Sequence, residues 1–391
     1  MLRVVLALDW HPLSIGGVQS HVRYLAKFLA NYGLEVYVIS RKTGKVAERT
    51  LDTLGDYECM LVNSMLPFDV ILVPPRRSEL EEIIFKIKPD VVHSHHAFTP
   101  LSLLSLDVAR KNTIPRVLTN HSIALGYEYT YLWRSSSLFL TPLKQILSSA
   151  NVVISVSKAA DKFISNFLRS TVKRLIVPNG VDTEKYKPLR NPPENYVVLF
   201  IGRLVYRKGV HLLLKAFRDV VSEIPEAKLL IVGKGYLEPI LKTMASTLDL
   251  KRNVIFRGLV SEEEKIHLLQ SSAVVAVPSI YGESFGVVAI EAFATGTPVI
   301  AFKVGGLAEI VDHGVNGFLA NVGDLKRFTE YLVTLLQDRK LRKKMSKNAR
   351  LKAEKKYSWS IISKEIYRIY LALHSGNMFE GIINSREFYS I

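Results

Sequence analysis

Two glutamates eight positions apart offer the clearest chemistry in this sequence. Glu283 ends the loop Pro278-Ser279-Ile280-Tyr281-Gly282-Glu283, and Glu291 lies in the helix that this loop is expected to open. If the whole span were helical, the two residues would be about 12 Å apart along the axis, at ~1.5 Å per residue. They should then address opposite ends of one elongated ligand. A buried amphipathic helix with one solvated glutamate would show the same pattern.

The residues between the two glutamates, 284–288, fall at the expected start of that helix. The first amides of a helix lack intrahelical partners and, with the helix dipole, they bind anions. Carboxylates that accept sugar hydroxyls beside amides that accept phosphate suit a nucleotide-sugar.

A second group of charged residues lies between an expected strand and an expected helix, in residues 200–209. Arg203 can hold a phosphate with two hydrogen bonds, and Lys208 adds a point charge. For Arg207, a solvated surface position is the simplest interpretation.

Paired glycines precede the first expected helix, in Ile15-Gly16-Gly17-Val18-Gln19, and the helix should cover about residues 20–32. Gly16 and Gly17 would let a phosphate approach the backbone amides closely. A tight turn that needs a left-handed residue would look the same.

Four histidines follow two expected strands: His93, His95 and His96 after one, and His121 after the next. Ligands of open α/β sheets bind beyond the carboxyl ends of the strands, where these side chains are expected. A zinc site is disfavoured because no carboxylate or thiolate partner is close. We expect two of the four to be structural, and His121 to be catalytic or to contact a sugar.

The composition describes a globular protein with a basic surface. The chain has 391 residues, 48% hydrophobic and 23% charged, and a net charge of +16 from 52 Lys and Arg against 36 Asp and Glu. The length favours two domains, and the charge favours an anionic partner: nucleic acid, anionic lipid or a phosphorylated substrate. The single cysteine excludes an internal disulfide framework. For the basic run 339–356, a solvated helix face is preferred to a nucleic-acid site.

No run of about 18 uncharged apolar residues occurs, so no transmembrane helix is expected. The apolar start of the chain is too short for a signal peptide. We therefore expect a cytoplasmic protein.

Strand-like runs alternate with helix-length segments, which predicts an α/β fold of two facing doubly wound, Rossmann-like domains. The expected strands lie near residues 3–8, 35–39, 70–73, 91–93, 116–119, 152–155, 174–177, 197–201, 228–232, 254–256, 274–277 and 299–301. A Pro-rich linker, 187–193, separates the halves. The expected domains are residues 1–190 and 191–357. A C-terminal helix, 358–375, should pack back on the first domain. No structure or role is predicted for the tail, 376–391.

Together these segments resemble the retaining glycosyltransferases of family 4, which have the two-domain GT-B architecture. The most specific part is the Glu283-x7-Glu291 motif, followed by Gly296-Thr297-Pro298 and residues 304–309. Residues 16–22 look like those of phosphatidylinositol mannosyltransferases. Residues 95–101 with 119–122 look like the catalytic subunit that transfers N-acetylglucosamine to phosphatidylinositol. Members of both kinds act on inositol lipids at the cytoplasmic membrane face.

The resemblance implies a role for each matching residue. Glu283 would accept hydroxyls of the donor sugar and Glu291 those of the ribose. Arg203 and Lys208 would stabilise the leaving diphosphate, and His121 would contact the sugar near the reacting carbon. Further donor contacts are implied for Phe285, Gly286 and Val287 at the diphosphate, for Gly16 and Gly17 in the first domain, and for Arg257, Gly258 and Leu259 at the base.

The implied reaction moves a hexose or N-acetylhexosamine from a UDP- or GDP-linked donor to an acceptor hydroxyl, with retention by front-face attack. The chain has no Asp-x-Asp pair for a catalytic Mg²⁺ or Mn²⁺, so we expect no metal and no cofactor. Charged groups in a closed site would instead neutralise the leaving diphosphate. The sequence does not predict which base and which sugar the donor carries.

Three other functions are weighed against this one. A dehydrogenase is disfavoured, because in Gly233-Lys234-Gly235 the third glycine of the dinucleotide fingerprint would fall on Glu238. A nucleotide-sugar epimerase of the same architecture and a non-catalytic sugar or nucleic-acid binding protein remain as alternatives.

The expected acceptor is a membrane inositol phospholipid, with a soluble sugar or glycan as the alternative. Aromatic residues alternate at Tyr127, Tyr129, Tyr131 and Trp133, either as a core strand or as a flap beside the acceptor. Aromatic rings with cations suit a membrane interface, and the same domain holds Arg76, Arg77, Lys86, Lys88 and Arg134. We therefore expect a peripheral enzyme on the anionic inner membrane face, with no nucleic-acid partner.

Overall fold

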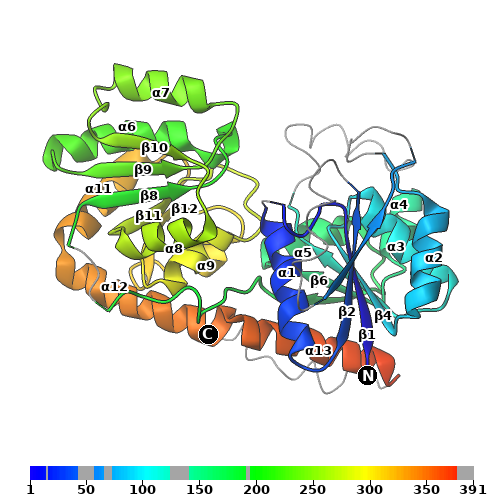
Figure 1. Cartoon of the computed structure of the whole chain (residues 1–391). Helices are drawn as coiled ribbons and strands as arrows, with labels where there is room; N and C mark the ends of the chain where they lie inside the picture. The colour runs from blue at the N-terminus through cyan, green and yellow to red at the C-terminus, as the bar shows by residue number, and fades with distance from the viewer. Residues whose placement is uncertain (15, 43–56, 66–72, 124–140, 191–193, 377–391) are drawn as a thin grey trace. The chain divides into compact units, whose positions relative to one another are not determined.

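The computed structural model describes residues 1–14, 16–42, 57–65, 73–123, 141–190 and 194–376. The chain divides into two compact units, one of residues 1–180 with the segment from Trp359 onward, and one of Val181–Ser358. Each unit contains one parallel sheet with helices on both faces (Figure 1). The predicted α/β class with two Rossmann-like domains is confirmed.

The first unit is built on a seven-stranded sheet of order β3-β2-β1-β4-β5-β6-β7, parallel throughout. The interior strand β1 is the apolar run Arg3–Leu8, which is buried on both faces after its first residue, as expected in a parallel sheet. The other strands are β2 (Glu35–Arg41), β3 (Glu58–Val62), β4 (Val91–His95), β5 (Arg116–Asn120), β6 (Val152–Ser155) and β7 (Lys173–Ile176).

Alternate residues of β1 point to two different cores. Val4, Leu6 and Leu8 pack with α1 (Gly17–Ala30) and α13 (Trp359–His374). Val5 faces the opposite core with α2 (Arg77–Ile87) and α3 (Pro100–Lys111). The shorter helices α4 (Thr141–Leu147) and α5 (Lys158–Ile164) complete the unit.

The C-terminal helix α13 belongs to the first unit, as the helical spacing of its apolar residues predicted. Its buried positions, Trp359, Ile362, Ile366, Ile369 and Tyr370, join the core that α1 and β1 form. In Figure 1, α13 passes close to α1, and the two helices are in contact. The chain therefore returns to complete the core of its N-terminal unit.

The second unit has a six-stranded parallel sheet of order β10-β9-β8-β11-β12-β13. Its strands are β8 (Val197–Ile201), β9 (Lys228–Val232), β10 (Val254–Gly258), β11 (Val274–Val277), β12 (Val299–Phe302) and β13 (Gly317–Ala320). Its helices include α6 (Val210–Glu223), α7 (Glu238–Thr247), α8 (Glu262–Ser271), α9 (Val287–Ala294), α10 (Leu307–Ile310), α11 (Leu325–Gln337) and α12 (Arg339–Lys352). The helices α6 and α11 pack on one face, and α8 and α9 contact strands of the sheet.

The structure differs from the expected domain boundary and contains two strands that were not expected. The first unit ends at Gly180 rather than residue 190, because the following residues bond to the second unit: Val181 pairs with Ser358, and Arg350 donates to the carbonyl oxygens of Thr183 and Tyr186. The edge strands β3 and β13 were not predicted. The strand expected near 70–73 falls mainly on residues outside those described.

The basic run forms the helix α12, whose exposed positions include Arg339, Lys340, Lys343, Lys344 and Lys347. This agrees with the solvated face that the sequence predicted. Among the described residues, no helix is long and apolar enough to cross a membrane.

Candidate active site

An ion pair between Lys208 and Glu283 forms the centre of the candidate site in the second unit. Lys208 Nζ lies 2.6 Å from Glu283 Oε2, and the Ser279 hydroxyl donates to the same oxygen at 2.9 Å. Both charged side chains are largely buried, with 17% and 12% of their surfaces exposed. Sequence reasoning named both residues but did not predict that they bond to each other.

The environment of Glu283 keeps its carboxylate ionised. Burial alone would raise its pKa, but the positive charge of Lys208, hydrogen bonds from Lys208 and Ser279, and the charge of Arg207 outweigh burial and lower the pKa below its ordinary value. Glu283 is therefore an acceptor of hydrogen bonds at neutral pH.

A close approach of two loops makes the ion pair possible. Lys208 ends a short 3-10 turn, Tyr206–Lys208, and the next residue, Gly209, has a φ of +69°. A Cβ atom on Gly209 would lie 1.9 Å from the carbonyl oxygen of Pro278, so only glycine fits there. The absence of a side chain at Gly209 thus allows Lys208 to reach Glu283.

Arg207 also joins the same two loops through hydrogen bonds. Its guanidinium donates to the carbonyl oxygen of Gly282 at 2.9 Å, and its own carbonyl accepts from the amide of Ile280 at 2.8 Å. The interpretation of Arg207 as a solvated surface residue is therefore wrong. Its sequence position between two expected ligands gave no sign of this role.

The helix α9 begins at Val287, after Gly286, whose φ of +114° favours glycine. Residues from Glu283 to Gly286 are thus not helical, and the expected 12 Å rise does not apply. Phe285 is buried, and the amides at the start of α9 are those that a helix leaves without intrahelical partners. Phe285, Gly286 and Val287 lie together at this start, as the sequence predicted.

Glu291 is buried inside α9 and is also held by a lysine. Lys265 Nζ in α8 lies 2.7 Å from Glu291 Oε1, and the Tyr186 hydroxyl donates to that oxygen at 3.4 Å. Sequence reasoning missed Lys265 and Tyr186. Only the tertiary packing of α8 and of the segment after Val181 brings them to Glu291.

The remaining predicted donor residues lie nearer the surface. Arg203 is exposed. Arg257 pairs with Glu264 at 2.9 Å, and Leu259 is 55% exposed. Gly258, with a φ of +70°, ends β10 and accepts a hydrogen bond from the amide of Gly233. None of these three strand-end residues bonds to Glu283 or Glu291 within the described chain.

In the first unit, Gly16 precedes α1 and Gly17 begins it. Gly16 has an extended backbone, with φ 165°, so the alternative of a left-handed turn residue is wrong for it. A Cβ atom on Gly16 would instead lie 2.2 Å from the side-chain oxygen of Gln19. The amide of Gln19 therefore occupies the space next to the glycine.

Two of the four predicted histidines have structural bonds. His93 bonds Tyr370 through Nδ1 at 2.5 Å and Thr119 through Nε2 at 2.7 Å, both within the core. His96, at a φ of +78°, bonds the Ser122 hydroxyl through Nε2 at 3.0 Å. The strand β4 extends through His95, so His93 and His95 lie within the strand rather than after it.

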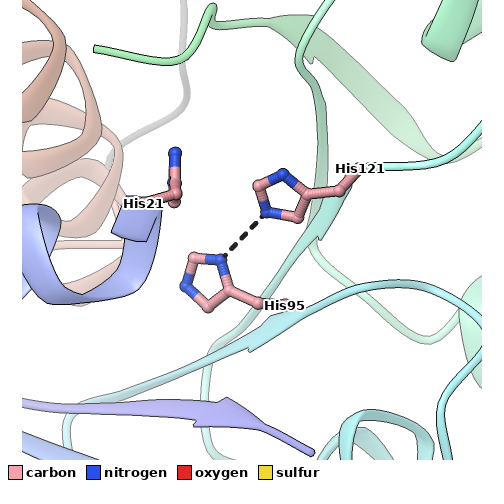
Figure 2. A group of neighbouring side chains, drawn as sticks. All are labelled: His21, His95 and His121. Carbon is pink, nitrogen blue, oxygen red and sulfur yellow. Dashed lines mark hydrogen bonds between the residues drawn. The ribbon is translucent and has the colours of Figure 1, made fainter. Parts of the chain in front are cut away.

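His121 follows β5 and faces His95, with His95 Nδ1 3.4 Å from His121 Nε2 (Figure 2). Asn120 fixes the turn that carries His121, because its side-chain amide bonds the carbonyl oxygens of Ser122 and Ala160. Burial, and next the charges of neighbouring histidines, lower the pKa of His121 well below its ordinary value. His121 is therefore a neutral imidazole that could accept or donate one hydrogen bond.

His21 is the third member of this group, and sequence reasoning missed it. Its ring, from α1, lies with its centroid 4.8 Å from that of His121 and 5.4 Å from that of His95, and Trp359 packs against it. The aromatic segment 127–133, the neighbouring Arg134 and the predicted acceptor flap lie outside the described residues.

Two sequence families match the two units in turn. The family described as "Glycosyl transferases group 1" matches residues 181–352, and "Glycosyltransferase Family 4" matches residues 15–185. The fold and the paired glutamates at α9 define a glycosyltransferase of the GT-B class.

Relatives with known names cover almost the whole chain. A phosphatidyl-myo-inositol mannosyltransferase from Mycolicibacterium smegmatis is 31% identical over 371 residues, which are 91% of this chain and 90% of the relative. This chain belongs to the family-4 glycosyltransferases, as the sequence predicted. A glycogen synthase from Mycobacterium tuberculosis is 26% identical over 95% of both chains.

A solved structure shows the same fold. The Anabaena protein HepE, in complex with UDP-glucose, has a TM-score of 0.78 and 21% identity, and the similarity covers 95% of this chain and 100% of that one. At this identity the likeness concerns the fold alone.

Proposed function

We propose that this glycosyltransferase moves a hexose or N-acetylhexosamine from a nucleoside-diphosphate sugar to a hydroxyl of a membrane inositol phospholipid, with retention. One observation carries the donor part of the proposal. Glu283 and Glu291, on either side of the start of α9, each have one oxygen bonded to a lysine. No described residue bonds to the other oxygen of either carboxylate, so each can accept hydroxyls of a ligand.

The donor would lie along the start of α9. Glu283 Oε1 accepts hydroxyls of the sugar, Glu291 Oε2 accepts those of the ribose, and the amides of Phe285, Gly286 and Val287 bind the diphosphate. Arg257, Gly258 and Leu259 contact the base, and Gly16 and Gly17 supply further donor contacts. HepE binds UDP-glucose, which supports a UDP-linked donor, and a GDP-linked donor is the alternative.

The leaving diphosphate needs positive charge when the bond to the sugar breaks. Arg203 and Lys208 supply this charge without a metal ion. The acceptor hydroxyl attacks the anomeric carbon on the face that the diphosphate leaves, and its proton passes to the departing phosphate oxygen. His121 holds the sugar near the reacting carbon.

The inositol-lipid acceptor is supported by the similarity to a phosphatidyl-myo-inositol mannosyltransferase. Its attachment to a membrane is supported by Phe85, which is 61% exposed on α2 beside the exposed Lys86 and Lys88. Arg76 and Arg77, two other cations of this region, pair with acidic residues. The charge offered to anionic lipid is therefore smaller than the sequence suggested.

A soluble glycan is the second candidate acceptor, because the chain is also similar to a glycogen synthase. Assays with labelled nucleotide-sugars separate the candidates. The protein is incubated with phosphatidylinositol vesicles or with a soluble glycan, and label is counted in the organic and aqueous phases. We expect label in the organic phase, rising with phosphatidylinositol content.

Faster transfer to the glycan than to lipid, with equal recovery of protein in the supernatant with and without anionic vesicles at low salt, would contradict the acceptor proposal. Conversion of the donor with no acceptor present would indicate the epimerase instead.

A further inference from the structure

Three buried imidazoles from three different elements of the first unit lie close together. His21 comes from α1, His95 from the end of β4, and His121 from the residue after β5 (Figure 2). One nitrogen of each ring lies within 4.8 Å of one nitrogen of the other two. Sugar binding by His121 alone does not account for the other two rings.

The three imidazole rings do not form all the hydrogen bonds that their nitrogens could make. Neither ring nitrogen of His21 makes a well-formed hydrogen bond with a described residue, although the Asn179 side chain lies near this ring. Nε2 of His95 also lacks a partner among the described residues. A buried polar atom without a partner destabilises the folded chain. A ligand that bonded the nitrogens of His21 and His95 would offset this cost.

The spacing of the nitrogens suits a small ion. In a tetrahedral site with metal–nitrogen bonds of about 2.0–2.1 Å, the ligand nitrogens lie roughly 3.3 Å apart. His95 Nδ1 and His121 Nε2 are 3.4 Å apart, too close for a water molecule between them. The nitrogens of all three rings lie within 4.8 Å of one another, so His21 needs only a small ring movement to reach that spacing.

We propose that His21, His95 and His121 form a binding site for one transition-metal ion of the Zn²⁺ class. Three imidazoles leave a fourth position for water, and nitrogen ligands favour Zn²⁺, Ni²⁺, Co²⁺ or Cu²⁺ over the hard ions Mg²⁺ and Ca²⁺. His121 keeps 9% of its surface exposed, so the ion enters beside it. The ion binds reversibly, and the fold does not depend on it.

The site differs from the zinc site that the sequence disfavoured. That candidate consisted of His93, His95, His96 and His121, which lie close in sequence or at neighbouring strand ends. In the structure, His93 and His96 form hydrogen bonds with other side chains. His21, from the helix α1, lies beside His95 and His121 instead.

Metal binding is measured directly on the full, untagged chain. After dialysis against a chelator, the protein is titrated with Co²⁺ and the visible absorption of tetrahedral Co²⁺ is followed, with Zn²⁺ and Mg²⁺ as competitors. We expect one Co²⁺ per chain, displaced by Zn²⁺ and not by Mg²⁺. X-ray absorption of the Zn²⁺ form should show three imidazole ligands.

Variants assign the site to these residues. His21→Asn and His121→Asn should each weaken binding at least about tenfold. His267→Asn is the matched control, because His267 is exposed on α8 in the second unit. If the His21 and His121 variants fail to fold, the number of imidazole ligands found by X-ray absorption of the wild-type protein tests the site.

Three results would overturn the site: no saturable binding of one ion, fewer than three imidazole ligands, or unchanged affinity in a folded His21→Asn protein. Any of them would mean that the three rings pack together without binding an ion.

An activity assay adds a consequence that rests on the proposed function. A bound ion occupies His121, so Zn²⁺ should inhibit sugar transfer, and EDTA should restore it. Metal binding without inhibition would support the metal site and would show that His121 does not contact the sugar.

Discussion

Lys208 Nζ lies 2.6 Å from Glu283 Oε2, although the two residues are 75 positions apart in the chain. The contact joins the loop after β8 to the loop before α9. It places Lys208, the cation proposed for the leaving diphosphate, directly beside the carboxylate proposed to hold the sugar.

The two glutamates should contribute to different kinetic constants. Glu283→Gln removes the charge of a hydrogen bond to the reacting sugar, which costs about 1.5–3 kcal/mol. We expect kcat to fall at least about tenfold. Glu291→Gln should mainly raise KM for the donor, because the ribose contact is the same in ground and transition states. Steady-state kinetics over a range of donor concentrations that extends to saturation measures both constants.

Glu263→Gln is the matched control for these variants, since Glu263 is an exposed glutamate of α8. Wild-type kinetics in both the Glu283 and the Glu291 variant would refute the assignment of the donor site.

Turnover should persist after divalent ions are removed. The two cations Arg203 and Lys208 and the amides at α9 are sufficient to bind the diphosphate in the proposed mechanism. Arg203→Ala should therefore reduce the rate more than EDTA does, while Arg218→Ala, an exposed arginine on α6, should have little effect. Complete loss of turnover in EDTA, restored by Mn²⁺, is the outcome that contradicts this mechanism.

Gly209→Ala tests the loop contact that brings Lys208 to Glu283. Alanine would have to adopt a φ of +69°, and its Cβ would meet the Pro278 carbonyl at 1.9 Å. Gly314→Ala is the control, because Gly314 has a φ of +78° with no atom within 4 Å of the added Cβ.

The backbone strain common to both variants costs about 1 kcal/mol. We expect the Gly209 variant to lose clearly more unfolding free energy in urea than the Gly314 variant, and to bind the donor more weakly. Equal losses in the two proteins would show that the loop contact contributes nothing.

The lowered pKa of Glu283 predicts how acid affects stability. A carboxyl group with an ordinary pKa of 4.5 binds its proton more readily in the unfolded chain than in the folded one. Its contribution is therefore present above about pH 4.5 and is lost as the pH falls through the folded-state value.

Denaturant titrations from pH 7 downward measure this effect. The stability difference between wild type and Glu283→Gln should be constant near neutral pH and should shrink below about pH 4.5. A difference that grows as the pH falls would contradict the ionised, lysine-paired state.

The sequence predicted the sheets well, because parallel strands buried on both faces are short apolar runs with clear ends. It missed the edge strands β3 and β13. The strand β13 has only four residues and begins with Gly317, and propensity alone does not distinguish such a segment from a loop.

The site was predicted only in part, for a physical reason. Glu283, Lys208 and His121 lie at strand ends or before helices, where local pattern is informative, and Glu291 lies within the helix that follows Glu283. Lys265, which bonds Glu291, and His21, which joins His95 and His121, project from ordinary amphipathic helices. Their roles come from packing between elements distant in sequence, which periodicity does not show.

The anomeric configuration of the transferred sugar tests the central claim most directly. The product formed from a nucleoside-diphosphate α-hexose is isolated, and its anomeric configuration is read by proton NMR immediately after transfer, with Glu283→Gln protein run in parallel. Our account predicts an α-linked product from the wild type and at least about tenfold less of it from the variant. A β-linked product, or equal yields from the two proteins, would contradict it.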